Sequence, residues 1–433
     1  MSDKPVLSLD VLESAVGGRA AAFRAVTRLE PAGGPGDKIF PPTYAVDKAA
    51  PLKYAVETRR RNGESIDSVL IDSVASQANR MEEALFAAWE DGRLLFPVIG
   101  VDFSGYEDLA DLGKITTLQA PHRIADAILR DSVDGHGTPF RSTEAGKAYT
   151  DARPQNATAV YRYCPTALVL GVWDSTGPKG GLGAKFQRAL VSEIVGYGVV
   201  TGSKTASRID PLGILSGVQV YHISGDDKDY TVDPAQARKN SKGEPELLKA
   251  KDKTKKAGRA SNTNHSNVAP TIDTTSGGVT IDSAEQTTVL SLVALRQLRF
   301  VSAVDGTPLG GSERLVAEKA ARTALAALGL AAVVELFAQG FHLRSRSLLV
   351  PSRPLEIELV PTTGGQVVTY SLTQDQAAEL LNAAHAKAKA VGMEWEREPF
   401  SLLPAPKLVD LIRKSRELSR KGVAEDDEVH DAS

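Results

Sequence analysis

The segment GPKGGLGAK, residues 177–185, is the stretch of this chain best suited to hold a phosphate. An apolar run precedes it, and the residues after it suggest a helix over 184–195. A glycine loop between a strand and the N-terminus of a helix presents backbone N–H groups to an anion. Lys179, Lys185 and Arg188 add positive charge at the same place. The segment therefore predicts phosphate binding, on a nucleotide or on a nucleic-acid backbone.

The glycine loop does not fit the two common nucleotide-binding motifs. In the P-loop pattern G-x-x-x-x-G-K-[ST], Leu182 and Ala184 stand where glycine is required, depending on the alignment. Phe186 stands where a hydroxyl would bind magnesium, and it also occupies the third glycine of the Rossmann pattern. A nucleotide hydrolase, which an ATPase assay would reveal, therefore has little support. A solvated turn remains the plainest alternative.

Other residues suited to phosphate contacts combine glycines, hydroxyls and cations. Around the glycine loop they are Ser175, Thr176, Lys179, Gly180, Gly181, Gly183, Lys185 and Arg188. The segment TGSKTASRIDPLG, residues 201–213, repeats the pattern with Lys204 and Arg208. Ser73, Ser76 and Arg80 share the polar face of a predicted helix, and Gln77 lies where that face meets the apolar stripe. Such contacts hold a nucleic-acid strand without reading its sequence.

No convincing catalytic constellation is visible. The seven histidines are scattered, and none forms a helical metal-binding pair. The single cysteine, Cys164, begins an apolar run, which favours a buried structural thiol and excludes a disulfide within the chain. His122, Arg123 and Asp126 fall on neighbouring turns of a predicted helix. They suit either acid–base chemistry or, preferably, an ion cluster at a helix start. We expect no cofactor and no metal.

Composition and charge limit the class of protein. The chain has 433 residues, of which 42% are hydrophobic and 24% charged, as in soluble globular proteins. The tail after Gly422 carries five carboxylates, and removing that −5 from the net charge of −3 leaves +2. Residues 238–259 hold nine Lys and Arg against three Asp and Glu, so charge is segregated.

Two further features of the sequence indicate where the protein works. The apolar run 323–334 is too short to span a membrane and predicts a buried helix. The N-terminal sequence lacks the pattern of a signal peptide. We therefore expect a cytoplasmic protein without a membrane partner.

Periodicity predicts strands and helices that mix without strict alternation, which favours an α+β fold. The predicted strands lie at 18–31, 53–59, 94–103, 164–175, 213–223, 285–300, 347–359 and 366–371. The predicted helices lie at 66–90, 120–132, 184–195, 313–339, 374–391 and 406–420. Residues 224–283 show little apolar periodicity, and a gap of that size is usually functional or disordered. It is either a surface loop or a protruding arm that becomes ordered on a partner.

Four motifs in this order resemble the CRISPR-associated RAMP protein of type I-U systems, also called type I-G. They are LIDSVASQANRMEEAL, PHRIADAILRDS, LGVWDSTGPKGGLGAKFQRALVSEIVG and TASRIDPLGI, and the resemblance runs from about residue 66 to 214. It implies an RRM-like (ferredoxin-like) palm with thumb and finger insertions. Residues 1–223 and 284–420 would form the palm with helical finger elaborations, residues 224–283 the thumb, and residues 421–433 a disordered acidic tail.

The resemblance also implies a function. Proteins of this family form the backbone of the Cascade surveillance complex, where copies polymerise head to tail along one CRISPR RNA. Each copy grips the sugar–phosphate backbone and leaves bases free to pair with the target DNA strand. The family subunit is not a nuclease: the complex also contains a large subunit and a subunit that binds the 5′ handle, and it recruits a helicase–nuclease.

Carried onto this sequence, the resemblance makes the glycine loop, the polar helix face and the pair Lys204 and Arg208 three candidate RNA-backbone contacts. In the predicted thumb the basic candidates are Lys249, Lys251, Lys253, Lys255, Lys256 and Arg259. The aromatic signature of ordinary RRM domains is absent, which fits backbone gripping better than base stacking on the sheet. The alternative function is a metal-independent RAMP ribonuclease that processes precursor CRISPR RNA, with His122 as general acid or base.

Overall fold

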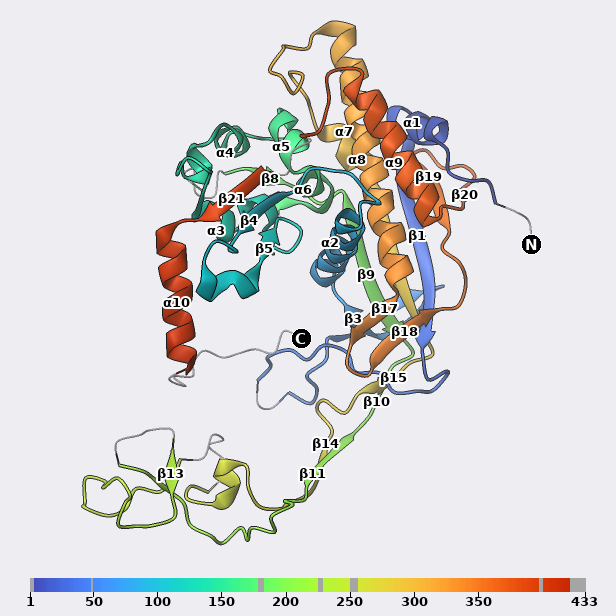
Figure 1. Cartoon of the computed structure of the whole chain (residues 1–433). Coiled ribbons are helices and arrows are strands. Elements are labelled where there is room, and N and C mark those ends of the chain that lie inside the picture. Colours follow the sequence, from blue (N-terminus) through green and yellow to red (C-terminus); the bar gives the residue numbers. More distant parts are fainter. Residues whose placement is uncertain are drawn as a thin grey trace.

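The computed structural model describes residues 4–47, 50–177, 183–224, 229–249, 256–396 and 400–420. A body of helices and strands carries a long arm, residues 202–277, that extends away from it (Figure 1). The body combines a large antiparallel sheet with a layer of helices, so the predicted α+β class is confirmed. The sequence did not predict the relative positions of body and arm.

A nine-stranded antiparallel sheet forms one layer of the body. In spatial order its main path is β17 (Phe341–Arg344), β18 (Ser347–Pro351), β1 (Ala20–Pro31), β16 (Ser283–Ser291), β9 (Leu190–Tyr197), β3 (Glu64–Asp72) and β2 (Val56–Arg61). β19 (Ile357–Pro361) pairs with β1 and with β20 (Val368–Tyr370). In β1, which falls within the strand predicted over 18–31, the side chains of Phe23, Ala25 and Leu29 are buried together, because alternate residues of a strand face the same side.

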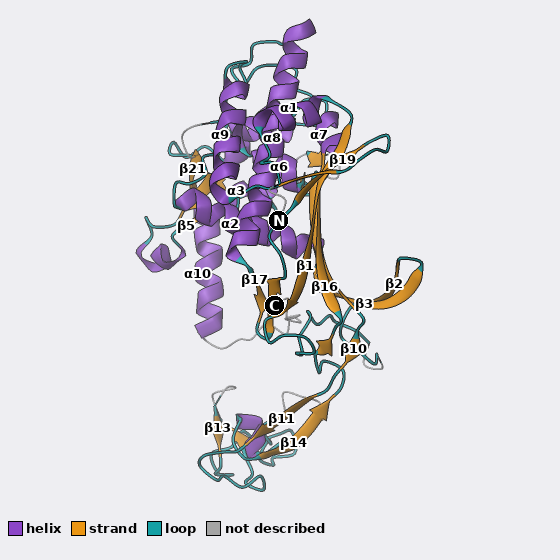
Figure 2. Cartoon of the chain, turned by 90° about the vertical axis from the view of Figure 1, so that its right-hand side faces the viewer, coloured by secondary structure: helices purple, strands orange, loops and turns teal. Residues whose placement is uncertain are grey.

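The helices cover one face of this sheet (Figure 2). The long α8 (Gly311–Gln339) packs against α1 (Leu9–Gly17), α2 (Val74–Glu90), α6 (Pro165–Leu170), α7 (Leu292–Gln297) and α9 (Gln374–Lys389). By length and composition α8 could cross a membrane, but 89% of its apolar window is buried inside the protein. A helix that is apolar on every side is typical of a core, and the predicted buried helix is confirmed.

A smaller lobe packs beside the helices and shares their apolar core. Its sheet runs in the order β5 (Lys114–Thr116), β4 (Ile99–Asp102), β21 (Phe400–Pro404) and β6 (Ser132–Val133). Short helices surround it: η1 (Glu107–Leu112), η2 (Arg123–Ala125), α3 (Ala127–Arg130), η3 (Phe140–Ser142), α4 (Glu144–Thr150) and α5 (Thr158–Tyr163). The last helix, α10 (Pro406–Arg420), is held to η1 by Arg413, which donates to the two carboxylate oxygens of Asp108 at 2.7 and 2.8 Å.

The arm is a two-stranded ribbon with an irregular distal lobe. β10 (Val200–Thr201) and β15 (Val279–Thr280) pair at its base, and β11 (Lys204–Arg208) and β14 (Val268–Asp273) form the ribbon. The distal lobe contains β12 (Tyr221–His222), β13 (Tyr230–Thr231) and η5 (Ala260–Thr263). The arm therefore starts about twenty residues before the predicted insertion at 224. The strand predicted at 213–223 is wrong except for its last residues, because that segment belongs to the arm and not to the core.

Several predicted elements differ from the structure. The helix predicted over 66–90 is a strand up to Asp72, and only Val74–Glu90 is helical. Ile66 and Leu70 are four residues apart, a spacing that places them on one face of either a helix or a strand, so periodicity alone cannot separate the two. The helix predicted over 120–132 shortens to η2 and α3. The strand predicted over 285–300 ends at Ser291, where the N-cap of α7 begins a helix.

The secondary structure on either side of the glycine loop is the reverse of the prediction: the segment before the loop is mainly helical, and the segment after it forms strands. The strand predicted over 164–175 is mainly α6, which has Pro165 in its first turn, followed by β7 (Val172–Trp173). The helix predicted over 184–195 is β8 (Lys185–Phe186) followed by β9, in which Leu190, Ser192 and Ile194 are buried alternately. The predicted phosphate cradle at a helix N-terminus is therefore wrong.

Candidate nucleic-acid interface

The glycine loop connects the two strands of a short β-hairpin. β7 and β8 pair antiparallel, with Trp173 opposite Lys185. Ser175, Thr176 and Lys185 are exposed, and the Nζ atom of Lys185 lies 4.9 Å from the centre of the Trp173 ring. The predicted contacts Lys179, Gly180 and Gly181 lie outside the described residues, whereas Gly183 is half-buried. The hairpin thus presents an exposed cation beside an exposed aromatic ring.

Buried polar contacts fix the base of this hairpin. The guanidinium of Arg141 donates to both oxygens of the buried Asp174 at 2.7 and 3.0 Å. Arg188 is exposed and its Nε atom donates to the carbonyl of Leu170 at 3.2 Å. Paired donors from arginine to a carboxylate give a well-defined geometry. Arg188, which was predicted to contact phosphate, thus has the carbonyl of Leu170 as a local partner, and its side chain still lies at the surface.

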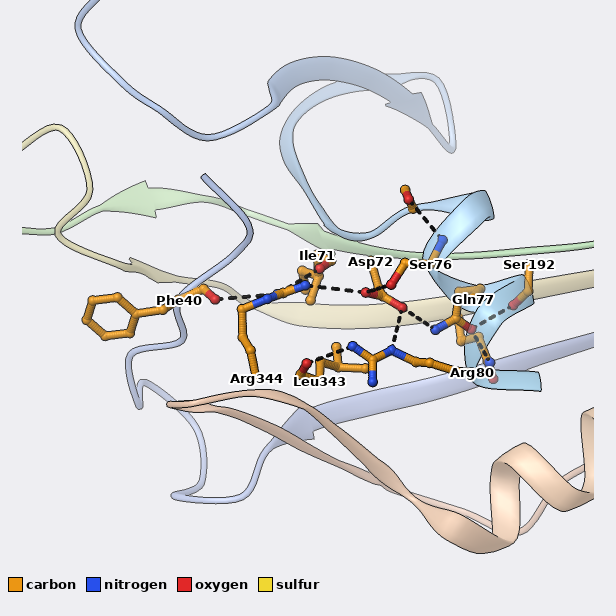
Figure 3. Close-up of polar contacts among 11 residues, drawn as sticks. Phe40, Ile71, Asp72, Ser76, Gln77, Arg80, Ser192, Leu343 and Arg344 are labelled. Atoms are coloured by element: carbon orange, nitrogen blue, oxygen red, sulfur yellow. Dashed lines mark hydrogen bonds and ion pairs between the residues drawn. The ribbon is translucent and has the colours of Figure 1, made fainter. Parts of the chain in front are cut away.

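Of the four residues predicted to form a polar face on α2, Ser76, Gln77 and Arg80 instead contact the buried Asp72 (Figure 3). Ser73 is the N-cap of α2, and its hydroxyl accepts from the backbone N–H of Ser76 at 3.2 Å. The hydroxyl of Ser76 donates to Asp72 at 2.8 Å. The Nε atom of Arg80 donates to Asp72 at 3.0 Å. Most of this predicted contact face is an internal hydrogen-bond network.

The prediction of a surface contact is most clearly wrong for Gln77, because its side chain is fully buried. Its Nε2 atom donates to Asp72 at 2.6 Å. Its Oε1 atom accepts from Ser192 Oγ at 3.1 Å and from Gln286 Nε2 at 2.8 Å. Gln77 therefore joins α2 to β9 and β16 and does not lie at the surface. A buried polar side chain is stable only with its hydrogen bonds made, and here they are.

Five cations gather where the arm leaves the body, and we call them the arm-base cluster: Lys38, Arg80, Lys204, Arg344 and Arg346. They come from four segments that are far apart in the sequence, namely the loop after β1, α2, the arm and the β17–β18 turn. The Nζ atom of Lys38 donates to the carbonyl of Ser203 at 2.8 Å. This contact ties the loop after β1 to the first residues of the arm.

Asp72 holds Arg80 and Arg344 of the arm-base cluster in place (Figure 3), and Phe40 stacks with Arg346. The Nη2 atom of Arg344 donates to Asp72 at 3.3 Å, and its Nη1 atom donates to the carbonyl of Ile71 at 3.0 Å. The guanidinium of Arg346 lies 4.1 Å from the centre of the Phe40 ring. Arg346 has a positive φ of 60°, which is uncommon for a residue other than glycine. The turn is thus shaped to stack its arginine on Phe40.

The electrostatics of the arm-base cluster leave a positive excess. Asp72 faces two arginines, and Asp273 faces Lys204 at 3.5 Å. Burial lowers the pKa of Arg344, and Asp72 opposes that shift. Five cations thus meet two carboxylates in these contacts. Such an excess at a surface attracts anions such as phosphate.

The arm contributes fewer free cations than its sequence suggests. Arg208 donates to the carbonyls of His265 and Ser266 at 2.8 and 2.9 Å and so connects two segments of the arm. Lys249, Lys256 and Arg259 are exposed. Lys251, Lys253 and Lys255 lie outside the described residues, as does the acidic tail.

The residues considered for catalysis have structural surroundings. Arg123 is buried and donates to both oxygens of Glu82 at 2.6 and 2.9 Å, and Asp126 caps α3. His122 is exposed. Cys164 is buried as predicted, and burial raises the pKa of its thiol. Within the part of the chain that the structure describes, no group of three or more His, Cys, Asp or Glu could hold a metal ion.

Lys38, Arg344 and Arg346 are not among the contact residues predicted from the sequence. A signal was present for the two arginines, because the segment RSRS (344–347) lies between the helix predicted over 313–339 and the strand predicted from 347, and so puts cations in a short connection. Lys38 lies in a Pro- and Gly-rich connection that has no periodicity. Only the structure places these residues beside α2 and the arm.

Part of the chain is similar to a known protein family. Residues 23–201 match the family model described as CRISPR-associated protein GSU0053. No curated protein matches the chain. One similar solved structure is the crystal structure of Thermofilum pendens Csc2, with 10% identity, coverage of 96% of this chain and 81% of that chain, and a TM-score of 0.25, a level that carries no structural argument. The matched residues make up less than half of the chain and contain three of the four motifs quoted above, so this part of the chain is similar to a CRISPR-associated family.

Proposed function

We propose that this chain is the CRISPR RNA-binding backbone subunit of a type I Cascade complex. Copies follow one another head to tail along the guide RNA in the cytoplasm, and each presents bases for pairing with the target DNA strand. The observation that carries the proposal is the arm-base cluster, a positive surface at the junction of body and arm in a chain that is similar, over part of its length, to a CRISPR-associated family. The other partners are the large subunit, the subunit at the 5′ handle and the recruited helicase–nuclease.

In this proposal the arm-base cluster holds phosphates of the RNA backbone. Lys204 and Arg346 are exposed and Lys38 is half-buried, whereas Arg80 and Arg344 use donors on Asp72 and on backbone carbonyls. Contacts to phosphate fix the register of a strand without reading its bases. The arm acts as the thumb that closes over the strand, and the glycine hairpin supplies a second contact through Lys185 and Arg188.

The chemistry at the arm-base cluster supports holding rather than cutting. The carboxylate of Asp72 accepts from Ser76, Gln77, Arg80 and Arg344. Four donors thus occupy this carboxylate in the folded chain. We therefore propose that the subunit is not catalytic and binds the guide RNA without breaking a phosphodiester bond.

A salt titration of RNA binding tests the proposal. We expect the purified chain to bind a fluorescent single-stranded RNA, with affinity falling steeply as salt rises, because bound cations are released. The double variant Lys38→Ala/Arg346→Ala should bind more weakly and lower the slope of log K against log salt by about 0.7 for each phosphate that the variant no longer binds. The matched control is Arg353→Ala, since Arg353 is exposed and lies outside the arm-base cluster.

Two results would replace this function. A monodisperse chain without RNA affinity at low salt excludes the backbone role. Cleavage of a labelled repeat RNA that is lost in His122→Ala establishes the ribonuclease alternative instead. A high ratio of absorbance at 260 to 280 nm, measured on protein purified from cells carrying a CRISPR array, supports the backbone role.

A further inference from the structure

A pocket of about 450 Å³ lies beside the glycine hairpin, and none of its lining residues belongs to the arm-base cluster. Its apolar floor is made by Leu168, Phe186 and Leu298, all of which are buried. It lies between β8, α6, α7 and the turn at 154–155. The pocket is therefore built from packed elements of the body, and its size suits a small organic group.

The polar groups of this pocket are uncharged amides and one cation. Gln155, Gln187 and Gln297 line it, and the Nε2 atom of Gln187 donates to the Oε1 atom of Gln297 at 2.7 Å. That bond leaves the Gln187 carbonyl oxygen with acceptor capacity and the Gln297 amide nitrogen with donors. Lys185 also lines the pocket, with its ammonium over the exposed ring of Trp173. Among the described residues of the lining there is no carboxylate.

The apolar floor, the amides and the lysine of this pocket together suit a nucleotide as its ligand. An apolar floor with a donor and an acceptor at its edge suits a neutral, flat group with hydrogen bonds on its rim, which describes a nucleobase. The ammonium of Lys185 suits an anion attached to that group. A neutral amino-acid side chain from another protein would use the floor and the amides but would leave the lysine without a counter-charge.

We propose that this pocket, which we call the hairpin pocket, takes one unstacked base of the bound RNA, while Lys185 holds an adjoining phosphate. The inference rests on the proposed RNA-binding function and adds a contact to a base at a place where sequence reasoning expected contacts to phosphate only. Amides on flexible side chains accept more than one base, so we expect the site to be tolerant of sequence. Trp173 at the rim offers a stacking surface for the neighbouring base.

Photo-crosslinking of the full chain tests this site. The probe is a single-stranded oligouridine that carries 4-thiouridine, and mass spectrometry maps the crosslinked residues. This readout does not depend on the register of the RNA. We expect crosslinks within 185–187 or 294–298 or at Trp173. In Ala294→Phe, which fills the hairpin pocket, the yield of these crosslinks should fall about fivefold or more, the reduction expected when one base no longer binds.

The neighbouring variant Val293→Phe is the matched control. Val293 is on the same short helix and is exposed, but it does not line the pocket. It should keep the crosslinks. Circular dichroism checks the fold of both variants. If Ala294→Phe does not fold, the double variant Gln187→Ala/Gln297→Ala removes only exposed amides and should give the same reduction.

The outcomes separate this inference from the proposed function. Absence of RNA binding by the unaltered chain overturns both. RNA binding with no crosslink at the hairpin pocket, or with the same crosslinks in Ala294→Phe as in the unaltered chain, overturns the base site alone. Either of these two results would favour a side chain of a protein partner as the occupant of the pocket.

Discussion

The body and the arm keep their shapes by different means. In the body, α8 buries nearly every side chain of its central turns, including Leu325 and Leu328. In the arm, Ile209 is 86% exposed, Leu215 76% and Ile272 72%. Large apolar side chains this exposed are normal when single, but clustered on one protruding element they mark an interaction surface. The body is built around its own core, whereas the arm leaves large apolar side chains exposed at its surface.

Polar contacts replace the missing core in the arm. One oxygen of Asp210 accepts from the backbone N–H of Ser266 at 2.6 Å, and the other accepts from that of Leu212 at 3.0 Å. Arg208 binds the carbonyls next to the same segment. Each such bond contributes about 1 kcal/mol net, so the arm opens more easily than the body. The comparison therefore predicts large effects for changes in the body and small ones in the arm.

The largest effect is expected from breaking the ion pair of Glu82 and Arg123 inside the body. Arg123→Met leaves the buried Glu82 carboxylate without its partner, and this should lower the free energy of unfolding by about 3–5 kcal/mol. Burial raises the pKa of Glu82 to about 7. The loss should therefore shrink as the pH falls below 7, because a protonated carboxyl has no charge to leave unpaired.

Urea unfolding, followed by the fluorescence of the buried Trp395, measures this loss. The control Arg153→Met removes an exposed arginine and should change stability by less than about 0.5 kcal/mol. A loss below about 1 kcal/mol for Arg123→Met at pH 8 would contradict the prediction.

A smaller effect is expected at the junction of body and arm, where Asp72 accepts four hydrogen bonds. Asp72→Asn keeps the shape but replaces one acceptor oxygen with an NH₂ group facing other donors, at a cost of about 1–3 kcal/mol. The control is Asp67→Asn on the same strand, where the carboxylate is exposed and accepts from Thr58. Unfolding in urea measures both, and under the proposed function only Asp72→Asn also weakens RNA binding. Equal stability of the two variants would show that Asp72 does not organise the junction.

The same contrast explains what the sequence could predict. Phe23, Ala25 and Leu29 alternate strictly, and α8 is apolar over many turns, so local pattern settles both elements. Around the glycine loop the runs are short, and a short apolar run suits a strand and a helix equally. Tertiary context decided these cases in favour of β9 and α6.

The arm-base cluster could not be predicted in the same way. Lys38 and Arg346 are about three hundred residues apart in the chain. The local sequence pattern around either residue does not indicate that the two lie close together in the fold. The polar residues of α2 were noticed, but periodicity cannot show that Asp72, one residue before the helix cap, draws them inward. The motifs indicated a resemblance to a family, whereas the geometry of the contacts required the fold.

Replacing Asp273 at the base of the arm is expected to loosen the arm without changing the stability of the whole chain. Hydrogen bonds from Ser276 and Thr275 hold the pKa of Asp273 below its ordinary value of 3.8. The stability that this carboxylate gives the arm is therefore present above about pH 4 and is lost as the pH falls through its lower folded value. Asp273→Asn should imitate that loss at neutral pH. We expect faster trypsin cleavage within the arm and an unchanged melting temperature, whereas unchanged cleavage would show that another contact holds the ribbon.

The smallest effect on stability is expected from the most exposed apolar side chains of the arm. Ile209→Ser/Leu215→Ser should leave the free energy of unfolding within about 0.5 kcal/mol, because neither side chain is buried in the single chain. Leu325→Ala in α8, by comparison, should cost about 2–5 kcal/mol, since it opens a cavity in the core. If the arm surface contacts another copy or an RNA-bound partner, the serine variant should lose assembly in sedimentation while it keeps its fold. A loss of more than about 1 kcal/mol in the free energy of unfolding would mean instead that these side chains pack within the single chain. The contrast between a body with a buried core and an arm with an exposed apolar surface would then be wrong.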